Sequence, residues 1–280
     1  MTVSSNGAQR ASRQRSVNLV LLSLLALAVS FGGLIASPSP VAAAGPKVVI
    51  VVGPVGSNTS SYISTAKGIA SHARSLGASV YEIYSPNATW SRVKSVAQGA
   101  KVLIYLGHGN GWPSPYGSFQ RYTKDGMGLN ATAGNGHRNV KYWGEYYVDR
   151  YINLASNAVV ILNRLCYASG NSEWGAANPT KATAIKRVDN FGAGFLRANA
   201  KAVFAEGITS PKYILSNLFK TNRSFKQIFW SAPHETESYR IGFSSVRTPG
   251  MSAVMDPYAP SRYYRSVIGK LTVTAAQWRG

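Results

Sequence analysis

The sequence predicts an α/β fold in which a mainly parallel sheet carries helices on both faces, giving three layers. Two observations lead to this prediction. Short apolar runs rich in β-branched residues alternate with segments of helical periodicity, a pattern typical of parallel sheets covered on both sides. The 280 residues are 45% hydrophobic and only 14% charged, which indicates a globular protein rather than a disordered or coiled-coil chain.

The first 44 residues have the order of a secretory signal peptide. Arg10, Arg13 and Arg15 precede an uncharged stretch over residues 17–36, and a Ser-Pro-Ser-Pro helix breaker and a run of small residues follow. This order predicts export, with cleavage after Ala44. The alternative is a membrane anchor formed by the uncleaved N-terminal segment, because about 20 uncharged residues can just span a bilayer.

Residues 45–280 are expected to form a single domain, and its first part contains three strands and two helices. The β-branched run Lys47–Val55 is typical of a strand buried on both faces. Asn58–Leu76 is expected to be a helix, because its apolar residues recur at helical spacing and Gly77 stops it. The next expected elements are a strand at Ala78–Tyr84, a helix at Thr89–Ala100 with one apolar face, and a strand at Lys101–Gly109 that ends in glycines.

A polar, glycine-rich stretch, Asn110–Asn139, follows and is too long for an ordinary connection, so it is expected to be a functional loop. From Glu235 onward, a Tyr/Arg-rich C-terminal extension has no pattern that predicts particular elements. The elements expected between them are a helix at Tyr142–Leu154, a strand at Ala158–Gly170 that ends at Cys166, a helix at Thr180–Asn199, a strand at Lys201–Gly207, a helix from beyond Pro211 to Lys220 and another around Phe225–Trp230.

Two of the expected strands end in residues that can take part in catalysis, at the same edge of the sheet. The third strand ends in Gly107-His108-Gly109, and the fourth delivers Cys166, the only cysteine. Active sites in such sheets lie outside the carboxyl ends of the strands, so these side chains can face each other. A thiol is a weak nucleophile until an imidazole removes its proton. Glycines beside His108 allow a substrate backbone to approach and leave an N–H free for a developing oxyanion.

These residues resemble the caspase-like cysteine peptidases, the group of caspases, gingipains and legumains, and are most similar to its CHAT and gingipain branches. The family pattern is an apolar strand ending in His-Gly, here Leu103–Gly109, followed by an apolar strand ending at the nucleophilic cysteine, here Val159–Gly170. Phe191–Gly207 resembles the helix and strand that those branches place after the nucleophile. The resemblance covers roughly residues 47–207.

The resemblance implies a secreted cysteine endopeptidase with a caspase-like three-layer fold, a protein or peptide substrate, and neither a cofactor nor a metal. His108 would be the general base and Cys166 the nucleophile. The backbone N–H groups of Gly109 and Cys166 would form the oxyanion hole. Leu165 departs from the pattern, because many members carry alanine before the cysteine, and no third carboxylate that orients the histidine is evident.

Four ionisable residues are candidates for substrate binding. Relatives that cleave after Lys or Arg often have Asp two residues before the nucleophile, where this chain has Arg164. Arg164 would favour an acidic P1 residue through bidentate pairing, or else point to a helix or the surface. Glu206 would suit a basic P1 residue, or else form an ion pair with one of the arginines. Asp125 and His137, in the long loop, are further candidates.

The positive charge supports a rival function. The chain has 30 Lys+Arg against 10 Asp+Glu, a formal charge of +20, with tyrosines interleaved among the basic residues near the C-terminus. Such a surface attracts acidic partners and would attach the protein electrostatically to an anionic cell envelope, although no nucleic-acid module is recognised. The alternative function is therefore a non-catalytic basic binding protein, secreted or at the cell surface, on a caspase-like scaffold.

Overall fold

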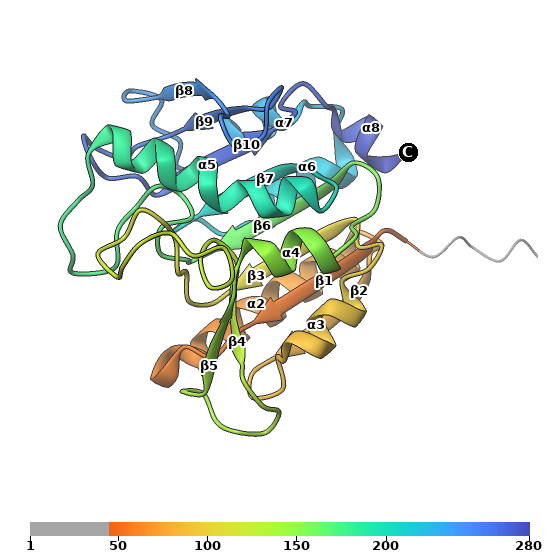
Figure 1. Cartoon of the computed structure of the whole chain (residues 1–280). Helices are drawn as coiled ribbons and strands as arrows, with labels where there is room; N and C mark the ends of the chain where they lie inside the picture. Colours follow the sequence, from red (N-terminus) through yellow and green to blue (C-terminus); the bar gives the residue numbers. More distant parts are fainter. Residues whose placement is uncertain (1–44) are drawn as a thin grey trace, which may run out of the picture. The chain divides into compact units, whose positions relative to one another are not determined.

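The computed structural model describes residues 45–280, in which eight strands form one mixed sheet of order β2-β1-β3-β6-β7-β10-β9-β8 (Figure 1). The first five strands of that order run parallel, and the last three continue the sheet antiparallel. The strands are β1 (Lys47–Val52), β2 (Ser79–Tyr84), β3 (Val102–Leu106), β6 (Ala158–Asn163), β7 (Ala200–Glu206), β8 (Ile241–Ser244), β9 (Ser252–Met255) and β10 (Arg265–Gly269). The predicted α/β class and mainly parallel sheet are confirmed.

Helices cover both faces of the sheet, because its central strands are apolar on both sides. On β1, for example, Val49 and Val51 belong to one buried core, and Val48 and Ile50 belong to the other. The helices of the first core are α3 (Trp90–Val96), α4 (Glu145–Tyr151) and α5 (Lys181–Arg197). Those of the second are α2 (Thr59–Ser75), α6 (Lys212–Lys220), α7 (Phe225–Phe229) and α8 (Ala275–Arg279).

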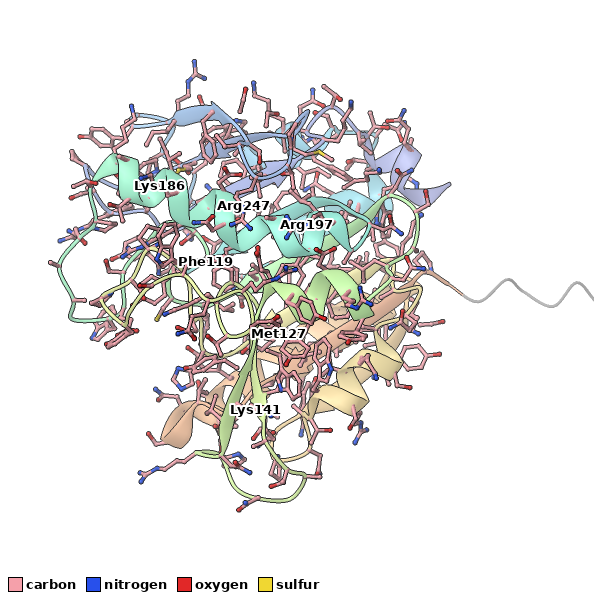
Figure 2. The ribbon with its side chains drawn as sticks, in the orientation of Figure 1. Phe119, Met127, Lys141, Lys186, Arg197 and Arg247 are labelled. Atoms are coloured by element: carbon pink, nitrogen blue, oxygen red, sulfur yellow. The ribbon has the colours of Figure 1, made fainter. Side chains whose placement is uncertain are left out.

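The long stretch after β3 is not wholly irregular. It contains β4 (Met127–Asn130), which pairs antiparallel with β5 (Val140–Trp143) in a separate two-stranded sheet. Helix α4 consequently begins at Glu145, three residues later than predicted. Arg197 and Arg247, both labelled in Figure 2, pair with the Glu145 carboxylate at 3.2 and 2.7 Å and so tie α5 and the β8–β9 turn to the start of α4.

The C-terminal segment is part of the sheet rather than an appendage to it. Strand β10 pairs with β7 on one side and β9 on the other, and each of its residues is buried. The predicted signal peptide or anchor, by contrast, lies outside the described residues. Within residues 45–280, no helix combines the length and the apolar character needed to cross a membrane.

Arg265 holds this last part of the sheet in place through buried ion pairs. It is 3% exposed, its Nε lies 3.0 Å from Glu206 on β7, and its Nη1 donates to Asp256. Its Nη2 donates to the Phe229 carbonyl at 2.7 Å. A buried charge is stable only when it is paired and hydrogen-bonded, and this arginine satisfies two carboxylates at once.

Replacing Arg265 by leucine is therefore expected to destabilise the protein by about 3–5 kcal/mol, because Glu206 and Asp256 would remain buried without a counter-ion. Urea unfolding followed by circular dichroism measures the change. The matched control is Arg262→Leu, an exposed arginine three residues away, with an expected effect within about 0.5 kcal/mol. Equal effects in the two variants would contradict this role for Arg265.

Candidate active site

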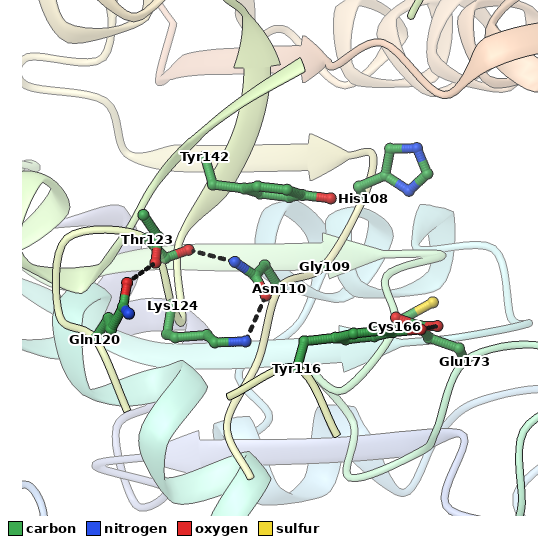
Figure 3. Close-up of a pocket in the computed structure, with 10 residues that line it drawn as sticks. All are labelled: His108, Gly109, Asn110, Tyr116, Gln120, Thr123, Lys124, Tyr142, Cys166 and Glu173. Atoms are coloured by element: carbon green, nitrogen blue, oxygen red, sulfur yellow. Dashed lines mark hydrogen bonds between the residues drawn. The ribbon is translucent and has the colours of Figure 1, made fainter. Parts of the chain in front are cut away.

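A pocket of about 600 Å³ lies at the carboxyl ends of β3 and β6 (Figure 3). His108 follows β3 and Cys166 follows β6, and both line this pocket, as the sequence predicted for the two strand ends. The pocket lining consists of His108, Gly109, Asn110, Tyr116, Gln120, Thr123, Lys124, Tyr142, Cys166 and Glu173. Half of these ten residues thus come from the long stretch Asn110–Asn139.

A buried tyrosine fixes the segment that carries His108. The hydroxyl of Tyr105, on β3, lies 3.0 Å from the His108 carbonyl oxygen and accepts a hydrogen bond from the Gly128 N–H on β4 at 2.9 Å. A Cβ at position 107 would lie 2.3 Å from that hydroxyl, so only glycine fits between the strand and the histidine. The β4–β5 hairpin therefore takes part in positioning His108.

The segments after β3 and β6 are in direct backbone contact. A Cβ on Gly109 would lie 2.0 Å from the Cys166 carbonyl oxygen, so glycine is required at this position. Within residues 45–280, neither the Gly109 nor the Cys166 N–H donates a hydrogen bond to another backbone group. Two unused amides beside a nucleophile are the donors that an oxyanion hole needs.

Cys166 sits on a strained turn. Arg164 and Tyr167, on either side of it, both have left-handed backbones, with φ of 61° and 69°. Non-glycine residues rarely adopt this conformation unless the surrounding structure imposes it, and such residues cluster at functional sites. The Arg164 N–H donates to the Glu206 carbonyl at 2.9 Å, and the Asn163 side chain donates to the same carbonyl at 2.7 Å. These bonds end β6 at Asn163, three residues before the predicted end at Cys166.

Burial keeps both members of the pair uncharged at neutral pH. Desolvation lowers the pKa of His108, although the Glu173 carboxylate opposes this shift. Desolvation and then Glu173 raise the pKa of the half-buried Cys166 thiol, against a backbone hydrogen bond from Trp174. In the described part of the chain, no hydrogen bond joins the two side chains. At neutral pH the pocket therefore holds a neutral thiol and a neutral imidazole.

Glu173 is a carboxylate of the site that the sequence analysis missed. It accepts hydrogen bonds from the hydroxyls of Tyr116 at 2.8 Å and Tyr167 at 2.9 Å. Its charge acts on both His108 and Cys166. No periodicity or motif marks it in the sequence; its only signal is its place seven residues after the cysteine.

Arg164 lines a second pocket, of about 660 Å³, that also contains Cys166. Its guanidinium lies 5.7 Å from the centre of the Tyr62 ring, within cation–π range, and the side chain is exposed. Arg262 lines the same pocket. Both arginines therefore lie where a carboxylate close to the thiol could pair with them.

Glu206 and Asp125 are corrections to the predicted substrate-binding set. Glu206 is fully buried, lines neither pocket and pairs with Arg265 at 3.0 Å. The structure therefore supports the alternative role predicted for Glu206, an ion pair with an arginine. Asp125 is also fully buried, and its Oδ1 accepts from the Trp112 N–H at 3.0 Å. Desolvation raises the pKa of Asp125 well above its usual value. His137 lines neither pocket, and its Nδ1 lies 3.0 Å from the Ser85 hydroxyl oxygen.

No family model matches the chain, and neither a curated protein nor a solved structure gives a match. The residues between 45 and 280 contain no group of three or more His, Cys, Asp or Glu side chains arranged to hold a metal ion.

Replacing Glu173 by glutamine is expected to lower the pKa of both His108 and Cys166, because the carboxylate raises both. The pH dependence of Cys166 alkylation and an NMR titration of the His108 ring measure the two shifts. Glu235→Gln, an exposed position outside both pockets, is the matched control and should leave both unchanged. A shift in the opposite direction, or none, would remove Glu173 from the electrostatics of the site.

Proposed function

We propose that this chain is a secreted cysteine endopeptidase of the caspase-like group, in which His108 and Cys166 form the catalytic dyad. The observation that carries the proposal is that the two residues leave adjacent parallel strands and line one pocket, beside two unused backbone amides. The α/β architecture, with a mainly parallel sheet between helices, supports it.

The proposed reaction begins from the neutral pair. His108 removes the thiol proton as the Cys166 sulfur attacks the peptide carbonyl carbon, and the amides of Gly109 and Cys166 stabilise the oxyanion. The C–N bond then breaks, and the imidazolium gives its proton to the leaving amine. Water, activated by His108, hydrolyses the thioester and restores the thiol. Glu173 favours the imidazolium of these steps, because its carboxylate raises the pKa of His108.

In this proposal, each of the two pockets binds the part of the substrate on one side of the scissile bond. The leaving amine must lie beside His108, so the leaving chain occupies the first pocket, which His108 lines. The acyl side then occupies the second pocket, where Arg164 and Arg262 favour an acidic P1 residue. This assignment keeps Arg164 as a specificity residue.

The first test is the rate of iodoacetamide alkylation of residues 45–280 between pH 5 and pH 9. In the wild type, labelling of Cys166 is expected to persist below the pH at which the thiol itself ionises, because His108 removes the proton as the sulfur attacks. His108→Ala is expected to lose this low-pH labelling, by about 10²-fold or more.

His72→Ala is the matched control, because His72 contacts Ser216 on the opposite face of the sheet and lines neither pocket. Labelling that follows a simple thiol titration and is indifferent to His108→Ala would reject the dyad. Cleavage of a peptide library with acidic P1 positions follows if the dyad is active, and Cys166→Ala should abolish it.

One surface favours the alternative of a non-catalytic basic binding protein. Aromatic rings from the segment before β4, from β5 and from α4 contact one another; Tyr122, which is 53% exposed, meets Tyr146 edge to face with 4.9 Å between ring centres. Cations lie over several of them, with Lys141 4.7 Å from the Trp143 ring and Arg121 4.7 Å from the Tyr146 ring. A cationic surface with partly exposed aromatic rings suits an anionic polymer of the cell envelope.

If this surface retains the protein on an anionic envelope, binding should fall steeply with salt, and Lys141→Gln should reduce the salt dependence. Co-sedimentation with anionic and neutral polysaccharides between about 50 and 500 mM NaCl measures it. Cys166→Ala is the control and should bind as the wild type does. Salt-independent binding would reject electrostatic attachment.

A further inference from the structure

Lys124 is a buried cation in the first pocket. It is 3% exposed, and its Nζ donates to Asn110 Oδ1 at 2.8 Å (Figure 3). The same Nζ also donates to Ser114 Oγ at 3.0 Å. Among residues 45–280, no carboxylate lies within ion-pairing distance of this ammonium. Both of its hydrogen-bond partners in the protein are neutral.

The carboxylates nearest to Lys124, those of Asp125 and Glu173, do not form an ion pair with it. Asp125 is desolvated, which raises its pKa and favours the uncharged acid. Glu173, in the same pocket, is held by the hydroxyls of Tyr116 and Tyr167. Burial also lowers the pKa of Lys124 itself, although these two carboxylates oppose the shift.

The protein satisfies the Lys124 ammonium only in part. Removing an ammonium from water costs several kcal/mol unless an anion or a full set of hydrogen bonds compensates. An ammonium has three donors, and two of those of Lys124 are used by the protein. A cation with a spare donor that lines the pocket beside His108 and Cys166 is prepared to receive an anion.

We propose that Lys124 selects substrates whose leaving chain carries a carboxylate, either an acidic side chain or a free C-terminus. The inference rests on the proposed function, which places the leaving chain in the pocket that His108 and Lys124 share. An ion pair with the substrate would compensate the desolvated ammonium, and charge-assisted hydrogen bonds are stronger than neutral ones. Lys124 would then be a specificity-determining residue on the side of the thiol opposite to Arg164.

Three alkylating probes test the proposal: chloroacetyl-glutamine amide, chloroacetyl-glutamic acid α-amide and chloroacetyl-glutamine. In each probe the Cys166 sulfur bonds to the methylene carbon of the chloroacetyl group, and chloride leaves. The amino acid of the probe then extends from the acetyl group as the leaving chain of a substrate would. The first is neutral, the second carries a side-chain carboxylate, and the third carries a terminal carboxylate. The faster of the two charged probes identifies the source of the carboxylate.

One charged probe is expected to label the wild type about tenfold faster than the neutral probe, the effect of a single charge-assisted hydrogen bond. Lys124→Met and Lys124→Gln should each remove this preference and keep the rate of the neutral probe, which shows that the site is intact. Arg164→Gln is the matched control and should retain the preference. Equal rates in the wild type, or a preference that survives both Lys124 variants, would overturn the proposal.

A second measurement separates this inference from the proposed function. If no probe labels Cys166, the dyad fails, and carboxylate binding is then measured by NMR titration of Cys166→Ala with acetyl-glutamic acid α-amide, acetyl-glutamine and acetyl-glutamine amide. Preferential binding of a charged ligand that Lys124→Met abolishes would sustain the anion site without the peptidase. Equal binding of all three ligands would reject the site as well.

Discussion

The buried pair of Glu206 and Arg265 is the interaction on which the geometry of the site depends. Glu206, the last residue of β7, is bound through both its backbone and its side chain. Its backbone carbonyl accepts hydrogen bonds from the Arg164 N–H and the Asn163 side chain, at the start of the turn that carries Cys166. Its carboxylate meets Arg265 on β10, which in turn holds Asp256. The turn that carries Cys166 and the C-terminal strands are therefore both held by Glu206, and a carboxylate buried this deeply requires the arginine.

Sequence periodicity predicted the parallel half of the fold well, because that half is made of runs such as Lys47–Val52 that are buried on both faces. It did not predict β4 or β10. Met127–Asn130 is four residues long and includes a glycine, and the residues around β10 mix Tyr, Arg and Ser without alternation. These strands are specified by their partners, through the Tyr105 hydroxyl in one case and the Arg265 ion pairs in the other.

The residues of the candidate site also fall into some that the sequence predicted and some that it did not. His108 and Cys166 could be predicted to share a pocket, because the carboxyl ends of adjacent parallel strands meet at one edge. Glu173 and Lys124 could not, because each reaches the pocket from an irregular segment whose path depends on hydrogen bonds made far along the chain. Glu206 and Asp125 were wrong as substrate-binding candidates for a related reason: their burial is set by strands and loops that pattern alone does not place.

The pocket's charges also separate the roles of its residues. Burial keeps Cys166 and His108 neutral at rest, so a substrate of the proposed peptidase would meet a neutral thiol and a neutral imidazole rather than a thiolate. The negative charge of Glu173 makes a resting thiolate still less favourable, yet in the proposed mechanism it would stabilise the imidazolium that forms as the sulfur attacks. Cations lie to both sides of the thiol, with Lys124 in one pocket and Arg164 in the other. An acidic chain that crosses Cys166 would meet a cation on each side, while Glu173, which lines both pockets, is held by the Tyr116 and Tyr167 hydroxyls. In the proposed peptidase, Lys124 and Arg164 would therefore set the preference for acidic chains.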